Sequence, residues 1–116
     1  MSTRCQVIVK DQWEELWFYR HCDGCPEGIK ESLELFLSLV KEGKLRDNAE
    51  QSSGWLIIIG YDEFGGPTPG SGGKVGSYEP CAPREHDDIR YLYTIDLVKK
   101  EITYKDVNTG VSGIAL

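Results

Sequence analysis

Residues able to do chemistry are concentrated between Trp17 and Gly28, in the stretch WFYRHCDGCPEG. Its histidine and carboxylates are suited to proton transfer, its arginine to anion binding, and its two thiols to metal binding or redox exchange. A second segment with histidine and carboxylates, His86-Asp87-Asp88, lies far downstream. If it folds over the first, the two segments form one site.

In one interpretation the two segments meet, and both histidines then share a site with carboxylates and an arginine for acid–base catalysis or for anion binding. The candidate catalytic residues are Arg20, His21, Asp23, His86 and Asp87. The candidate ligand-binding or partner-binding residues are Tyr19, Arg20, His21, Asp23, Glu27, His86, Asp87 and Tyr91. In the alternative, these residues are structural, with aspartates in turns and tyrosines in the sheet. Because the familiar hydrolase, metalloprotease and nucleotide-binding motifs are missing, the sequence favours a binding protein over an enzyme.

The four cysteines allow a metal site as an alternative. Cys22 and Cys25 have the spacing of half a zinc site, but the second half is poor because a proline lies between Cys81 and His86. Redox exchange at the Cys22–Cys25 pair is a further alternative, since a thiol at a helix start has a lowered pKa. We predict separate reduced thiols and no cofactor, with zinc on Cys22, Cys25, Cys81 and His86 as the alternative.

Two strands and a helix are expected to position the first segment. Residues 4–10 are rich in β-branched side chains, and residues 16–21 alternate, so a turn at 11–14 makes them an antiparallel hairpin. The alternation places His21 at the end of one face and Arg20 at the end of the other. Apolar residues then recur at helical spacing, which predicts a helix that starts near Pro26 and ends near Gly43.

The next segment is ambiguous. We predict a buried helix over about 48–62, because residues 47–50 have the spacing of a capping box. The strand-forming composition of Trp55 to Ile59 leaves a strand over 54–61 as the alternative. Residues 65–73 are rich in glycine and proline, which indicates a flexible loop rather than a phosphate-binding one.

Three further strands are expected at about 74–79, 89–97 and 101–107. The predicted order is ββααβββ: an α+β fold in which two helices cover one face of a mainly antiparallel sheet. With 116 residues, 40% of them hydrophobic, the chain is expected to form a single domain over residues 1–116.

The net charge narrows the choice of partners. Nineteen acidic and 13 basic residues give a formal charge of −6, which disfavours direct binding to nucleic acid or to an anionic membrane. No apolar run approaches the roughly 20 residues of a membrane span, and the first residues do not form a signal peptide. We therefore expect a cytoplasmic protein whose partner is a protein.

The sequence resembles a family of short uncharacterised proteins of phages and bacterial genomes. The similarity covers the MSTR start, the YRHCDGCPEG corner and the HDDIRYLY segment. Cys25 stands where relatives commonly have an aromatic residue, and Asp87 where they have a glycine. The resemblance implies a small acidic binding protein of phage origin, directed at a host or defence protein in the bacterial cytoplasm. The alternative is a small enzyme, or a protein that binds nucleotides or anions, with an Arg/His/Asp site at the corner.

Overall fold

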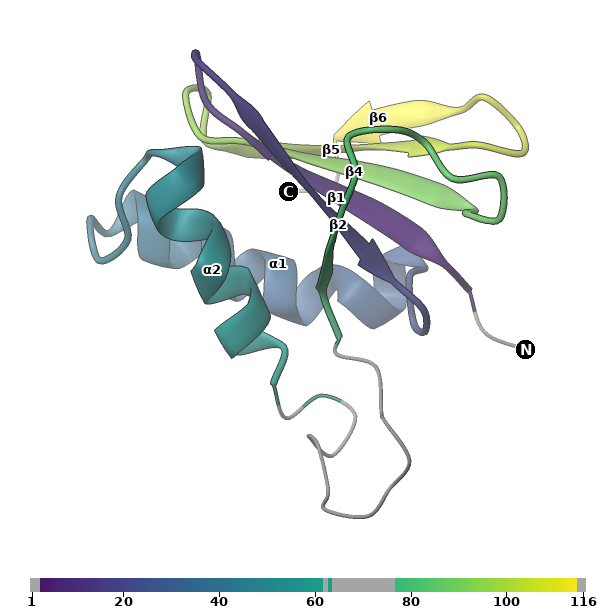
Figure 1. Cartoon of the computed structure of the whole chain (residues 1–116), viewed down its shortest axis with the longest axis horizontal. Helices are drawn as coiled ribbons and strands as arrows, with labels where there is room; N and C mark the ends of the chain where they lie inside the picture. The colour runs from purple at the N-terminus through teal and green to yellow at the C-terminus, as the bar shows by residue number, and fades with distance from the viewer. Residues whose placement is uncertain (1–2, 62, 64–76, 115–116) are drawn as a thin grey trace.

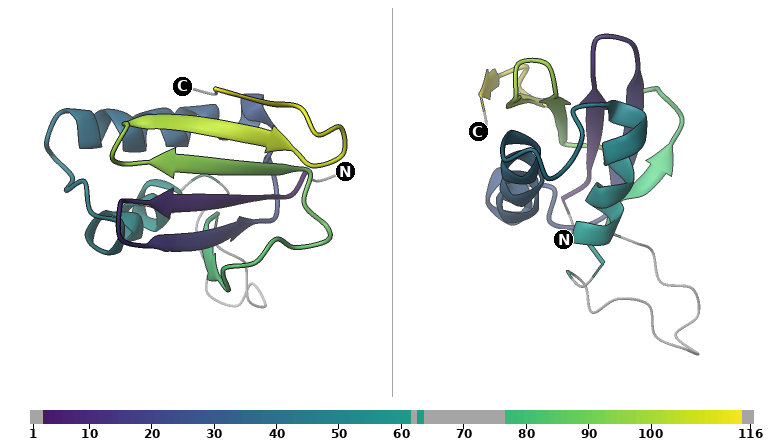
Figure 2. Two further views of the ribbon diagram at one scale, coloured as in Figure 1. Left: turned by 90° about the horizontal axis from the view of Figure 1, so that it is seen from above. Right: turned by 90° about the vertical axis from the view of Figure 1, so that its left-hand side faces the viewer.

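The computed structural model describes residues 3–61, 63 and 77–114. They form an α+β fold, as predicted, in which two helices lie on one face of a six-stranded sheet (Figure 1; Figure 2). The elements in chain order are β1 (Cys5–Lys10), β2 (Glu15–Arg20), α1 (Pro26–Lys41), α2 (Ala49–Ile59), β3 (Glu79–Cys81), β4 (Tyr91–Asp96), β5 (Glu101–Asp106) and β6 (Ser112–Ile114). None of the helices described is long and apolar enough to cross a bilayer.

The strand order is β3-β2-β1-β4-β5-β6, and β1 with β4 is the parallel pair among otherwise antiparallel neighbours. Cys5 at the start of β1 is paired with Arg20 on one side and with Tyr91 on the other. The end of β2 and the start of β4 therefore lie at the same end of the sheet. This register brings the segment before β4 toward the corner that follows β2.

The structure corrects two details of the predicted strands. The sheet has six strands rather than five, because the chain after β5 turns back and adds β6 as an edge strand. The strand expected at 74–79 is described only as Glu79–Cys81, where it pairs with β2. The glycine- and proline-rich loop predicted at 65–73 lies outside the described residues.

The first helix has the predicted sequence pattern and burial. Pro26 occupies its first turn, and Gly43 takes a positive φ of 75° just after its end, a conformation that costs glycine little. The buried side of α1 consists of Ile29, Ser32, Leu33, Phe36, Leu37 and Val40. These apolar side chains pack in the core with Val7, Phe18 and Ile95 of the sheet. Glu31 and Glu34 lie on the exposed side.

The ambiguous segment is a helix, so the alternative of a strand over 54–61 is wrong. Asn48 caps α2 by accepting a hydrogen bond from the backbone N–H of Gln51 at 3.1 Å. The buried side of α2 is formed by Ala49, Ser52, Ser53 and Leu56. The cap and the burial of one side of the segment, Leu56 included, favour the helix over the strand, while Trp55 and Ile58 of the same segment stay exposed.

The outward side of α2 is apolar in its second half. Trp55 is 46% exposed, Ile58 56% and Tyr61 just beyond the helix 58%, while Ser52 and Ser53 are buried. The small inward residues let the helix backbone approach the sheet closely. At Gly60 an added Cβ would lie 2.8 Å from the Tyr78 ring. Helix α2 therefore buries small residues together with Leu56 and leaves Trp55 and Ile58 exposed, whereas α1 buries most of its large apolar residues.

Candidate functional site

The predicted site residues divide between the two faces of the sheet. Successive side chains of a strand point to opposite faces, so Tyr19 and Arg20 at the end of β2 are directed away from each other. Arg20 shares the helix-covered face with Phe18, a core residue. Tyr19 shares the other face with the segment between β3 and β4. The structure therefore holds two polar clusters rather than one.

The cluster on the open face is centred on Tyr19. Its ring contacts the imidazole of His21, with centroids 4.6 Å apart, and the imidazole of His86, with centroids 4.8 Å apart. Its hydroxyl donates to a carboxylate oxygen of Asp88 at 2.5 Å. Burial, followed by this hydrogen bond, raises the pKa of the Tyr19 phenol well above its usual value. The His86 segment and the corner thus meet through a neutral phenol.

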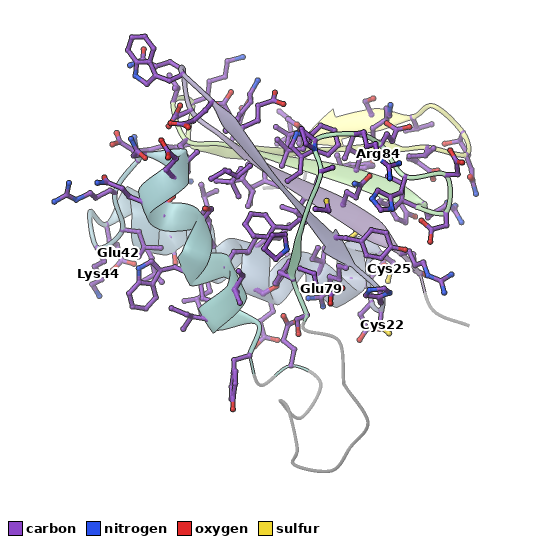
Figure 3. The ribbon with its side chains drawn as sticks, viewed as in Figure 1. Cys22, Cys25, Glu42, Lys44, Glu79 and Arg84 are labelled. Atoms are coloured by element: carbon purple, nitrogen blue, oxygen red, sulfur yellow. The ribbon has the colours of Figure 1, made fainter. Side chains whose placement is uncertain are left out.

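Carboxylates complete this cluster at its edge. His21 Nε2 lies 2.7 Å from Oε1 of Glu79, on the neighbouring strand β3, where Glu79 stands opposite Tyr19 (Figure 3). Arg4 lies 3.7 Å from the carboxylate of Asp88. Both histidines are partly exposed. Two imidazoles and two carboxylates at the surface could exchange protons with a small bound molecule.

Gln6 holds in place the segment between β3 and β4, which we call the crossing segment. The sequence did not suggest this role. The Gln6 side chain is fully buried, accepts a hydrogen bond from the backbone N–H of His86 at 2.9 Å and donates to the carbonyl of Arg84 at 2.9 Å. Glu79 was also missed, while Asp88 belongs to the predicted second segment but was not among the candidate site residues. One feature of the sequence could have revealed the role of Gln6: it is a lone glutamine among the apolar residues of a central strand. A buried amide requires polar partners, so such a residue indicates a polar segment nearby.

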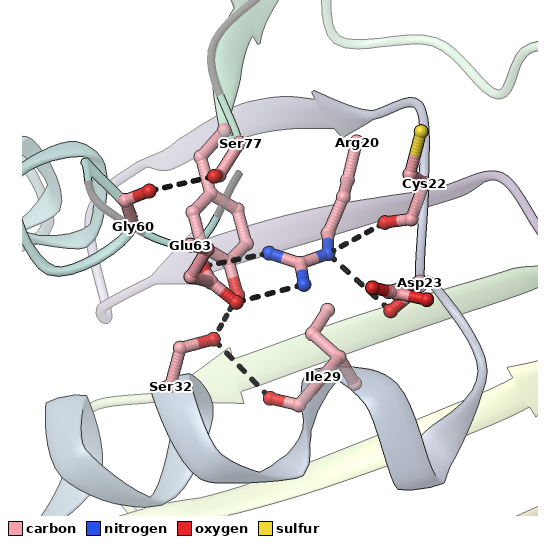
Figure 4. A network of polar contacts seen from close by, with 9 residues as sticks. Arg20, Cys22, Asp23, Ile29, Ser32, Gly60, Glu63 and Ser77 are labelled. Atoms are coloured by element: carbon pink, nitrogen blue, oxygen red, sulfur yellow. Dashed lines mark hydrogen bonds and ion pairs between the residues drawn. The ribbon is translucent and has the colours of Figure 1, made fainter. Parts of the chain in front are cut away.

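The cluster on the helix-covered face is centred on Arg20, whose side chain is only 1% exposed. Its two terminal nitrogens each donate to a carboxylate oxygen of Glu63 at 2.8 Å (Figure 4). Nε donates to the carbonyl of Cys22 at 3.0 Å, and the guanidinium lies over the ring of Tyr78. Burial disfavours the charged guanidinium, but the hydrogen bonds that Arg20 donates to Glu63 outweigh this effect and raise the pKa of Arg20.

Arg20 therefore holds the fold together. Glu63 follows α2 in the chain, so the ion pair joins the end of that helix to the end of β2. Beside it, Tyr78 forms a hydrogen bond with Ser32 of α1, and Ser77 donates to the carbonyl of Gly60 at 2.6 Å. With both terminal nitrogens of its guanidinium on Glu63, Arg20 is not directed toward the two histidines.

The remaining candidates lie apart from the Tyr19 cluster, and of these Asp23 contacts the other cluster through its backbone carbonyl, which accepts a hydrogen bond from Nε of Arg20 at 3.4 Å (Figure 4). Asp23 is exposed at the corner with a positive φ of 54°, and Glu27 is exposed in the first turn of α1. Asp87 is exposed in the crossing segment. Tyr91 lies on the helix-covered side, with its ring 6.1 Å from that of Tyr93. The structure thus brings Tyr19, His21 and His86 together and leaves the other predicted residues elsewhere.

The cysteines are free thiols. Cys5 is buried, and burial raises the pKa of its thiol to about 12. Cys22, Cys25 and Cys81 are partly exposed, the first two around the corner (Figure 3). Within the described ranges, no three side chains of histidine, cysteine, aspartate or glutamate gather into a group able to hold a metal ion. The zinc alternative on Cys22, Cys25, Cys81 and His86 therefore lacks the geometry that it requires.

A groove between the two helices lies next to the Arg20 cluster. Its volume is about 410 Å³. Its lining consists of Asp23, Gly28, Glu31, Ser32, Leu35, Ile59 and Glu63. We call it the α1–α2 groove. It combines apolar side chains from both helices with three carboxylates, and none of its lining residues in the described part of the chain is cationic. Leu35 is the large apolar residue that α1 leaves exposed.

Comparison with protein-family models, with curated proteins and with solved structures finds no match to this chain.

Proposed function

We propose that this protein works by binding another protein through the outward side of α2. The proposal is carried by one observation: α2 buries Ser52 and Ser53 while Trp55, Ile58 and Tyr61 remain exposed. A contiguous apolar surface in water raises the free energy of a free monomer, and such surfaces mark interaction sites. Tryptophan and tyrosine are also the residues that contribute most to protein interfaces.

Helix α1 provides the internal comparison. Most of its large apolar residues are buried and its charged residues face solvent, which is the usual pattern of a surface helix. The exposed apolar side of α2 departs from this pattern. Trp55, Ile58 and Tyr61 are spaced three residues apart and so lie along one side of a helical path. The exposed apolar side of α2 is thus a continuous strip, suited to an apolar groove of a partner.

The charge of the chain indicates the kind of partner. Its net charge is −6, and Glu50 is the charged residue of α2. A complementary partner presents an apolar surface bordered by basic residues. The resemblance to phage proteins supports a host or defence protein as the target, met in the bacterial cytoplasm. The acidic charge argues against nucleic acid as a direct partner.

Affinity capture from a bacterial lysate tests the proposal when it is combined with matched variants. Ile58→Asp places a charge in the middle of the strip and is expected to reduce recovery of the partner at least about tenfold. Trp13→Asp is the control, because Trp13 is 79% exposed in the β1–β2 turn, which lies beside Asn48 at the start of α2, whereas Ile58 is near the end of that helix. Both variants should keep the wild-type circular dichroism spectrum and thermal midpoint.

Two outcomes would contradict the proposal. One is equal recovery of the same proteins by wild type and by Ile58→Asp. The other is recovery that is lost with Trp13→Asp and kept with Ile58→Asp, which would move the interface to the turn. Sedimentation velocity of the purified protein separates self-association, in which a second copy covers the strip, from binding to a different protein.

A second candidate function is acid–base chemistry or anion binding on the open face. The observation that favours it is the contact of Tyr19 with both His21 and His86, with Asp88 and Glu79 beside them. Adenosine monophosphate is a suitable probe because it carries a phosphate and an aromatic base. It should shift the imidazole proton resonances of both histidines in a saturable way, and not those of the His86→Asn variant. Unchanged resonances at millimolar nucleotide would remove this candidate.

A further inference from the structure

We infer that the α1–α2 groove receives an arginine or lysine side chain of the partner that covers α2. This inference rests on the proposed function and adds the chemistry of the contact. The groove adjoins the apolar strip, since Ile59, next to Ile58 in the chain, is part of its lining. A partner lying along the strip therefore has the groove within its footprint.

The charge of the groove selects a cation. Its lining has three carboxylates, and that of Glu63 is neutralised by Arg20 at 2.8 Å. Neither Asp23 nor Glu31 belongs to any of the ion pairs within the described ranges. Lys30, the neighbour of Glu31 in α1, is directed to Glu34 at 3.7 Å. The groove therefore holds two negative charges without a counterion from the described chain.

The apolar part of the groove suits the stem of a long basic side chain. Leu35 and Ile59 approach from opposite helices, and the carboxylates lie in the same lining. Lysine and arginine pack their methylene groups against apolar surface while the charged end reaches a polar group. A volume of about 410 Å³ is sufficient for one such side chain. A second copy of this chain is a poorer occupant, because its own net charge is also −6.

The test uses a defined probe and the full chain. N-acetyl-arginine methylamide is titrated into ¹⁵N-labelled protein at low salt, with N-acetyl-norleucine methylamide as the uncharged analogue. The arginine compound should cause saturable shifts at Gly28, Glu31 and Ile59, with a Kd on the order of 10 mM. Sodium chloride at about 0.3 M should weaken binding, as expected for a partly exposed ion pair.

Two variants with the same change in net charge separate a specific contact from a general charge effect. Glu31→Gln removes a carboxylate of the groove and is expected to weaken binding at least about threefold. Glu42→Gln is the control, because Glu42 follows the C-terminal end of α1, far from Cys25 and the corner (Figure 3). It should leave the Kd unchanged. Asp23→Asn with Glu31→Gln should abolish the shifts.

Equal binding of the norleucine compound would overturn the inference, as would equal weakening by Glu42→Gln or the absence of shifts in the groove. These results are distinguishable from failure of the proposed function. If the arginine compound binds but Ile58→Asp does not affect capture, the groove is a cation site and α2 is not the interface. If Ile58→Asp abolishes capture but the arginine compound does not bind, the interface stands without a basic side chain in the groove.

Discussion

Arg20 and Glu63, 43 positions apart in the chain, form an ion pair with two hydrogen bonds of 2.8 Å between the sheet and the helices. The pair joins the end of β2 to Glu63, in the segment that follows α2. It explains why a residue type associated with anion binding is buried here: its counterion comes from the same chain.

Removal of the carboxylate should be costly. Glu63→Gln leaves the guanidinium of Arg20 buried without a counterion, so we expect the free energy of unfolding to fall by about 2–3 kcal/mol. Urea denaturation followed by circular dichroism measures this change. Glu31→Gln, an exposed carboxylate on α1, should stay within about 0.5 kcal/mol of wild type. Equal stability of both variants would show that the ion pair is dispensable.

Replacement by alanine should change the stability of the protein in opposite directions at Gly54, inside α2, and at Gly60, which caps the end of α2. At Gly54 an added Cβ meets nothing within 4 Å, so Gly54→Ala should stabilise the protein by about 1 kcal/mol through the helix propensity of alanine. At Gly60 it would lie 2.8 Å from the Tyr78 ring and 2.9 Å from Ser77 Cβ, so Gly60→Ala should destabilise it by about 1–3 kcal/mol. Thermal and urea unfolding of both variants test this. The opposite order would mean that α2 is rotated about its axis.

Asp11 should make stability depend on acid pH. Its carboxylate accepts hydrogen bonds from the backbone N–H groups of Ala49, Trp13 and Glu14, which lower the pKa of Asp11. A lowered pKa in the folded state adds stability above the unfolded value of about 4, and this stability is lost as pH falls through the folded value. Asp11→Asn should therefore be less stable than wild type near neutral pH.

The difference between wild type and Asp11→Asn should shrink steadily below about pH 4. Urea unfolding at a series of pH values measures it, with Asp87→Asn as a control of equal charge at an exposed position. A difference that stays constant through the acid range would mean that the hydrogen bonds to the turn and to α2 do not depend on the ionised carboxylate.

Cys5 should be the least reactive thiol. It is fully buried with a pKa raised to about 12, whereas Cys22, Cys25 and Cys81 are partly exposed. Iodoacetamide at about pH 8 should therefore modify those three in the folded protein and Cys5 only after urea is added. Peptide mass spectrometry reads each site. Modification of Cys5 at the rate of the others would mean that the start of β1 opens readily.

Some of this architecture was determined by the sequence alone. Helix α1, the β1–β2 turn and the Asn48 cap depend on contacts between residues a few positions apart, so local patterns predict them. Alternation along β2 also placed Arg20 and His21 on opposite faces. Side chains two positions apart lie on the same face of a strand, so the alternation alone assigns the faces. The hairpin forms between neighbouring segments and needs no distant segment.

Only the tertiary structure decided how these parts are used. The parallel pairing of β1 with β4 brings His86 to Tyr19, and Glu63, Arg84 and His86, the distant partners of Arg20 and Gln6, lie 43 to 80 positions away. The outward side of α2 could not be predicted either, since its composition indicated burial. Which face of a helix meets the core depends on the surface against which the helix packs, and here the inside takes Ala49, Ser52, Ser53 and Leu56 while Trp55 and Ile58 stay in solvent.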